Sequence, residues 1–168
     1  MNRIGYLLQP VGAPFPPQDI PIVLYQQGGP GGAMTNRWGT TAEEPFNLLP
    51  NFGFAVLFMP FSGREGFGPE FFRALADHDN FGQLDVAEGA QVVQYLLEQG
   101  YVQPGRVGIA GCSYGGYFVA QSITRFPDLY DAANIQCAVL DMIKWWEPNP
   151  YLVTFMEGAV PSAQPGTE

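Results

Sequence analysis

The residues best suited to chemistry lie between positions 106 and 118, in the stretch Arg-Val-Gly-Ile-Ala-Gly-Cys-Ser-Tyr-Gly-Gly-Tyr-Phe. An apolar run at residues 107–110 follows a Pro-Gly turn and is typical of a buried strand. The next residues fit the pattern G-x-S-x-G around Ser113. A serine at the top of a sheet needs a sharp strand-to-helix turn, so its neighbours two residues away must lack side chains. The pattern predicts a nucleophile elbow; the alternative is a glycine-rich turn whose serine caps a helix.

The helix expected after this turn, over residues 115–125, directs its first amides toward Ser113. Helix N-termini carry unpaired N–H groups and a partial positive charge. Together with the N–H of Tyr114, these groups can stabilise the oxyanion that forms when a serine attacks an acyl carbon. The stretch therefore predicts acyl-transfer chemistry with Ser113 as the nucleophile.

A second candidate element is the loop Gln27-Gly28-Gly29-Pro30-Gly31-Gly32, which follows an expected strand at residues 21–26. Its glycines let the backbone approach another group closely. Because no phosphate-binding lysine lies nearby, an anion-binding turn for an acyl oxygen fits better than a nucleotide loop. A plain flexible loop is the alternative.

This chemistry also requires a general base. A serine hydroxyl is a weak nucleophile until a base within hydrogen-bond reach removes its proton. The single histidine, His78, is flanked by polar residues, which favours a surface position over a catalytic one. Lys144 is a further candidate, but its spacing gives it no support. The base therefore stays open between His78 and a group from another chain.

The elements that must position these residues alternate along the chain. Strands are expected at residues 4–8, 21–26, 53–59, 107–110 and 135–140, and helices at 38–49, near 71–75, at 85–99 and at 115–125. This alternation predicts a mainly parallel α/β sheet with helices on both faces. We expect a single domain over residues 1–168, in which residues 146–168 form an irregular tail.

The clearest helix is expected over residues 85–99. Asp85 and Glu88 have the spacing of a capping box at its start, and Gly100 ends it. An apolar stripe runs along one side of this helix through Val86, Ala90, Val93 and Leu97.

Composition narrows the class of protein. Charged residues make up 14% of the 168 residues, and 46% are hydrophobic. So little charge indicates either a surface covered by another molecule or an apolar pocket. A net charge of −9 makes nucleic acid and anionic membranes poor partners. No feature predicts a cofactor or a metal site.

Compartment can also be inferred from the sequence. The two cysteines, Cys112 and Cys137, are expected to be reduced and buried. The N-terminal apolar run is too short for a signal peptide, and no stretch approaches the ~20 apolar residues of a membrane span. A cytoplasmic location is the expectation.

These motifs together resemble the prolyl oligopeptidase family. The resemblance is carried by Gly-Gly-Pro-Gly-Gly at 28–32, Gly-x-x-Gly-Phe-Gly at 63–68, the helix from Asp85, Gly-Cys-Ser-Tyr-Gly-Gly-Tyr at 111–117, Phe-Pro-Asp-Leu-Tyr at 126–130 and Leu-Asp-Met-Ile-Lys at 140–144. It covers residues 4–146 and implies the family's α/β-hydrolase catalytic domain in an incomplete form.

The resemblance implies a serine hydrolase that acts on peptides or small esters. Ser113 is then the nucleophile, and the oxyanion hole uses the N–H of Tyr114 and a donor from the loop at Gln27, Gly28 and Gly29. Many members have tyrosine or histidine at the Gln27 position, where the glutamine amide can donate instead. Asp141 stands at the expected tip of the strand after the elbow, the place of the acid in some α/β hydrolases; the family's own aspartate there favours a structural role.

The departures from the family leave a second class of function open. The positions of its catalytic aspartate and histidine have no counterpart in this sequence, and its propeller or other N-terminal domain is absent. The alternative to an enzyme is therefore an incomplete half-domain that binds a ligand or partner.

The last expectation concerns assembly. The strand at 135–140 lacks the charges, proline or bulge that protect sheet edges. We expect a homo-oligomer, a dimer in the simplest case, with residues 135–156 in its interface.

Overall fold

A computed structural model describes residues 4–35, 38–41, 44–76, 79–141 and 144. Its centre is one five-stranded sheet in the order β1-β3-β2-β4-β5. The strands are β1 (Tyr6–Leu8), β2 (Ile22–Gln26), β3 (Ala55–Phe58), β4 (Val107–Cys112) and β5 (Ala132–Gln136). Strand β1 pairs antiparallel with β3, and all other neighbours are parallel. The predicted mainly parallel α/β sheet is confirmed.

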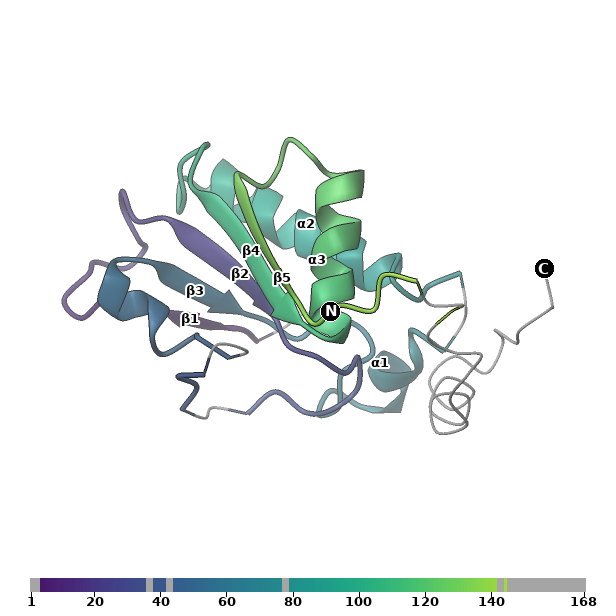
Figure 1. The fold of residues 1–168 in the computed structure, drawn as a ribbon. Coiled ribbons are helices and arrows are strands. Elements are labelled where there is room, and N and C mark those ends of the chain that lie inside the picture. Colours follow the sequence, from purple (N-terminus) through teal and green to yellow (C-terminus); the bar gives the residue numbers. More distant parts are fainter. Residues whose placement is uncertain (1–3, 36–37, 42–43, 77–78, 142–143, 145–168) are drawn as a thin grey trace.

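Four helical segments accompany the sheet: the 3-10 helix η1 (Leu49–Phe52) and the α-helices α1 (Pro69–Arg73), α2 (Leu84–Glu98) and α3 (Tyr114–Arg125). Figure 1 shows α2 and α3 side by side on one face of the sheet, with α1 near the ends of the strands. Because the carboxyl ends of parallel strands share one edge, the loops after β2, β3 and β4 meet at that edge.

The core between the sheet and these two helices is apolar. Leu24 of the central strand β2 lies opposite Leu57 of β3 on one side and Ile109 of β4 on the other. Val86, Val93 and Phe118 from the helices belong to the same buried cluster. Burying a side chain of this kind contributes roughly 1.5–3 kcal/mol, so this cluster fixes where the strand ends lie.

On the other face of the sheet an aromatic cluster packs against β2 and β3. The ring of Phe46 stacks on Phe58 at 5.2 Å and meets Tyr25 edge-on at 5.6 Å. The predicted helix at 38–49 is wrong: the described part of this segment consists of loop and turns that lead into η1. Pro45 has no backbone N–H to continue a helix, and the chain instead folds to bury Phe46.

The predicted strand after α3 exists, but its bounds of 135–140 are wrong, because β5 begins at Ala132 and ends at Gln136. Its start is set by Asp131: the Asp131 N–H donates to the carbonyl of Val107 at 2.7 Å, and the Val107 N–H donates to the Asp131 carboxylate at 2.8 Å. This exchange fixes the register of β5 against β4. Because β5 is exposed along most of its length, a search for a buried apolar run does not find its bounds.

The register of β5 against β4 also brings the two cysteines together. Cys112 at the end of β4 lies opposite Gln136, so the following residue, Cys137, falls beside it. Their Cα atoms are 5.4 Å apart and a disulfide joins them. The prediction of two reduced, buried cysteines is therefore wrong for this structure.

Assembly and membrane insertion depend on the edge strand and on the length of the helices. Within the described residues β5 has only β4 as a neighbour, but residues 145–156 lie outside them, so the homo-oligomer stays a prediction. None of the helices among the described residues has the length and apolar character required to cross a membrane.

Candidate active site

Ser113 occupies the sharp turn between β4 and α3. Its backbone has φ 59° and ψ −122°, a positive φ that a residue other than glycine rarely adopts, and its side chain is exposed. Such strained backbone persists where the surrounding structure enforces it, and it gathers at functional sites. The strand, the turn and the helix have the order that the G-x-S-x-G pattern predicts.

The glycines around Ser113 are required by contact with neighbouring backbone. A Cβ added to Gly115 would lie 2.0 Å from the carbonyl oxygen of Gln26, and one added to Gly111 would lie 2.5 Å from the carbonyl oxygen of Gly115. A Cβ on Gly116 would lie 2.5 Å from the carbonyl oxygen of Gln136. The start of α3 is thus pressed against the ends of β2 and β5.

The glycine loop after β2 lies directly against the nucleophile. A Cβ on Gly28 would be 3.3 Å from Ser113 Cβ and 3.8 Å from Ser113 Oγ. The loop is held in place by the guanidinium of Arg64, which donates to the carbonyl oxygens of Gly28 at 2.6 Å and Gly31 at 2.8 Å. A further bond runs to the carbonyl of Gln27. The alternative of a plain flexible loop does not fit a segment fixed at three carbonyls.

Arg64, which holds this loop, is the residue of the candidate site that sequence reasoning missed. It comes from the loop after β3 and is 2% exposed, although arginine is almost never fully buried unless it is paired. Burial lowers the pKa of its guanidinium to about 10, so it stays charged at neutral pH. Its place inside the Gly-x-x-Gly-Phe-Gly segment of 63–68 was the only available signal.

The capping box predicted at the start of α2 is wrong. The N-cap residue is Gln83, and it makes no side-chain capping bond. Asp85 instead accepts a hydrogen bond of 2.5 Å from the hydroxyl of Tyr114, and Glu88 accepts bonds from Ser62 N and Ser62 Oγ at 2.8 and 2.7 Å. Both carboxylates are buried and accept hydrogen bonds from groups on other elements, Tyr114 and Ser62.

Asp85 should make the stability of the protein depend on pH. Burial raises its pKa to about 6, against the bond from Tyr114, while Glu88 on the same helix raises it further. The folded state therefore binds this proton more tightly than the unfolded state does. As pH rises from about 4 to 6, deprotonation of Asp85 lowers the free energy of unfolding by roughly 3 kcal/mol. Above about pH 6 this contribution no longer changes.

Asp85→Asn keeps an oxygen that can accept the Tyr114 bond but cannot ionise. We expect the free energy of unfolding of this variant, relative to the unsubstituted protein, to rise by about 3 kcal/mol between pH 3.5 and 7. Urea titrations across this range measure it. Asp128→Asn, at an exposed aspartate before β5, controls for the loss of one carboxylate. A difference for Asp85→Asn that does not change with pH would contradict the expectation.

The structure describes the predicted acid but not the predicted base. His78 lies outside the described residues. Asp141 is not at a strand tip, because β5 ends at Gln136, four residues earlier than the expected strand did. Its carboxylate pairs with Lys144 at 3.1 Å in an exposed ion pair, with Asp141 50% exposed and Lys144 85% exposed. Among the described residues no group of three or more His, Cys, Asp or Glu could hold a metal ion.

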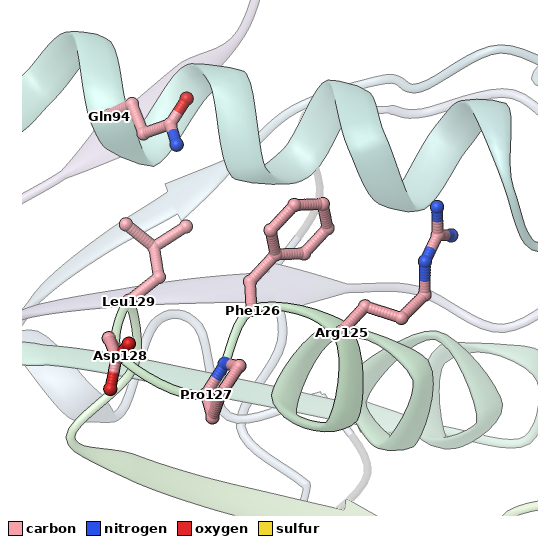
Figure 2. A pocket seen from close by; sticks show the side chains of 6 residues that line it. All are labelled: Gln94, Arg125, Phe126, Pro127, Asp128 and Leu129. Carbon is pink, nitrogen blue, oxygen red and sulfur yellow. The ribbon is translucent and has the colours of Figure 1, made fainter.

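A pocket of about 290 Å³ lies at the opposite end of α3 from Ser113. Figure 2 shows its lining: Gln94 from α2, Arg125 at the end of α3, and residues 126–129 of the turn before β5. Arg125 is held there, since it donates to the carbonyl of Gly82 at 3.1 Å. The 12 residues of α3 separate this pocket from the nucleophile by about 18 Å. It is not the substrate site of Ser113.

A strand, a strained serine turn and a helix on a mostly parallel sheet, with a glycine loop against the serine, define an α/β-hydrolase. The sequence profile of the prolyl oligopeptidase family matches residues 41–165. The chain belongs to the prolyl oligopeptidase family.

Curated relatives agree with this assignment. The acylamino-acid-releasing enzyme of Sus scrofa is 30% identical over 136 residues, which are 81% of this chain and 18% of that protein. Dipeptidyl aminopeptidase BIII of Pseudoxanthomonas mexicana is 32% identical over 111 residues, 66% of this chain and 15% of that protein. The chain thus spans less than a fifth of the length of these relatives.

A solved structure shows the same fold. The puromycin-hydrolyzing peptidase of Mycobacterium tuberculosis superposes with a TM-score of 0.81 at 24% identity, over 99% of this chain and 25% of that one. This likeness supports the incomplete α/β-hydrolase fold.

Proposed function

We propose that this chain carries the nucleophile and oxyanion hole of a serine peptidase or esterase. The observation that carries the proposal is the approach of the Gly28 backbone to Ser113, on a turn whose serine has a positive φ. A glycine loop held this close to a serine hydroxyl places backbone donors beside the acyl group that the serine would attack. The curated relatives, named as an acylamino-acid-releasing enzyme and a dipeptidyl aminopeptidase, point to peptide substrates.

The roles follow from position. Ser113 Oγ attacks the carbonyl carbon, and the carbonyl oxygen becomes an oxyanion. The N–H of Tyr114, the first residue of α3, donates to it from the helix N-terminus. The second donor comes from the loop at Gln27, Gly28 and Gly29, in which the Gly28 backbone lies against Ser113 and the Gln27 carboxamide can donate through its Nε2. The proton of Ser113 passes to His78 or to a base from another chain.

Fluorophosphonate labelling tests the proposal, because only an activated serine reacts with this probe. The tryptic peptide from Val107 to Arg125 contains two serines, Ser113 and Ser122. Ser122 is fully buried and serves as the internal control. After reduction of the disulfide, we expect one label per chain, on Ser113. No label on native protein would favour the predicted alternative, a half-domain that binds a ligand or partner.

A further inference from the structure

We propose that a buried polar network of Arg64, Asp85 and the Tyr114 side chain positions both sets of oxyanion-hole donors. The inference rests on the proposed function, because it assigns positioning residues to that site. None of the three side chains has to touch substrate. They hold in place the backbone that does.

The first half of the network is the grip of Arg64 on the glycine loop. Glycines offer no side chains that could fix a loop, so the carbonyls of Gln27, Gly28 and Gly31 are held instead by a single charged group. In a trans peptide the N–H points opposite to the C=O. Carbonyls turned toward the guanidinium therefore direct the N–H groups of Gly28 and Gly29 away from it. The guanidinium fixes the direction of the donors on this side.

The second half holds the residue that follows the nucleophile. The ring of Tyr114 is buried against Phe81, with centroids 5.2 Å apart, and its hydroxyl is bonded to Asp85. A side chain fixed at both its ring and its tip leaves its own backbone little freedom. The Tyr114 N–H, at the first position of α3, is therefore held in one direction.

The two halves share one support, helix α2. Asp85 and Glu88 lie three residues apart on its buried side; Asp85 holds Tyr114, while Glu88 holds Ser62, two residues before Arg64. The negative charge of Asp85 also reaches Arg64, where together with Tyr114 it opposes the lowering of the pKa by burial. Two carboxylates of one rigid helix thus fix loops that come from two different strands. Donors held in advance of reaction are what oxyanion stabilisation requires.

The test uses substitutions that leave every backbone donor in place. Arg64→Met removes the charge and the bonds to the loop, and Arg64→Lys keeps the charge without the fork that reaches three carbonyls. Tyr114→Phe removes only the hydroxyl. Tyr117→Phe is the matched control, since it makes the same change one turn along α3, in a ring 5.7 Å from that of Tyr114.

We expect Arg64→Met and Tyr114→Phe to slow fluorophosphonate labelling of Ser113 about 10- to 100-fold, and to lower kcat for an acyl ester by a similar factor with KM little changed. Arg64→Lys should fall between Arg64→Met and the unsubstituted protein. Tyr117→Phe should react at the unsubstituted rate. Labelling of Arg64→Lys and Tyr114→Phe at that same rate would overturn the inference.

Hydrogen exchange separates this inference from the proposed function, because it requires no activity. In Arg64→Met or Arg64→Lys, the amides of residues 27–33 should exchange at least tenfold faster, while those of β4 keep their protection. Unchanged exchange in this loop would overturn the inference even if Ser113 reacts. Faster exchange in a protein that does not label would keep the positioning role of Arg64 and reject the proposed function.

Discussion

Gly115→Ala is expected to destabilise the protein by about 3 kcal/mol or more and to abolish the reactivity of Ser113. The added methyl group would lie 2.0 Å from the carbonyl oxygen of Gln26 and 3.2 Å from the carbonyl carbon of Gln27, so either β2 or the start of α3 must move. Gly115 lies inside a helix, where alanine is ordinarily about 1 kcal/mol better than glycine. Helix propensity alone would make Gly115→Ala stabilising, whereas the contact with β2 should make it destabilising. Urea denaturation and fluorophosphonate labelling measure the two effects.

Gly105→Ala is the control for this substitution. Gly105 has φ 83°, and a Cβ there meets nothing within 4 Å. Its expected loss is therefore only the backbone strain, about 1–2 kcal/mol, with labelling of Ser113 unchanged. Equal losses in the two variants, or normal labelling of Gly115→Ala, would show that the contact between α3 and the end of β2 does not set the elbow.

Local patterns predicted the parts of the site that local sterics decide. The turn at Ser113 needs glycines and an apolar strand before it, and those requirements are visible within a dozen residues. The same holds for β2, whose apolar run ends at the glycine loop. In both cases the residues that determine the geometry are neighbours in the chain, so the sequence shows them together.

Contacts between distant segments were not predictable in this way. Asp85 and Glu88 have the spacing of a capping box, and nothing near them shows that their partners are Tyr114 and Ser62. Arg64 looked like one charge in a glycine-rich loop until the fold brought 27–31 to it. Buried charges depend on partners far away in sequence, and periodicity carries no information about those partners.

The end of the described chain shows the same limit. An apolar run at 135–140 indicated a buried strand, yet the ladder is fixed upstream by the exchange of hydrogen bonds between Asp131 and Val107. The shift of β5 moved Asp141 away from the strand tip and brought Cys137 beside Cys112. A change in strand register thus altered the predictions for an acid and for both thiols.

Ser113→Ala is expected to lower kcat/KM for a short acyl ester by about 10⁶-fold, the scale seen when one member of a catalytic unit is removed. A residual rate of roughly 10³-fold over water should persist, because the oxyanion donors are backbone groups that this substitution leaves in place. The fold should be unchanged, since Ser113 is exposed and does not belong to the buried core clusters. Steady-state hydrolysis measures the rates, and a thermal melt tests whether the fold is unchanged.

His78→Ala decides whether this chain supplies its own base. The effects of substitutions within one catalytic unit are not additive. If His78 takes the proton of Ser113, His78→Ala should lower kcat/KM as much as Ser113→Ala does. The double variant should then be no less active than either single variant. Asp79→Asn, one residue along, controls for a change in the charge of the same segment. A His78→Ala variant with near-normal activity would assign the base to another chain or to Lys144. Because Lys144 is paired with Asp141 in an exposed position, the other chain is then the stronger candidate.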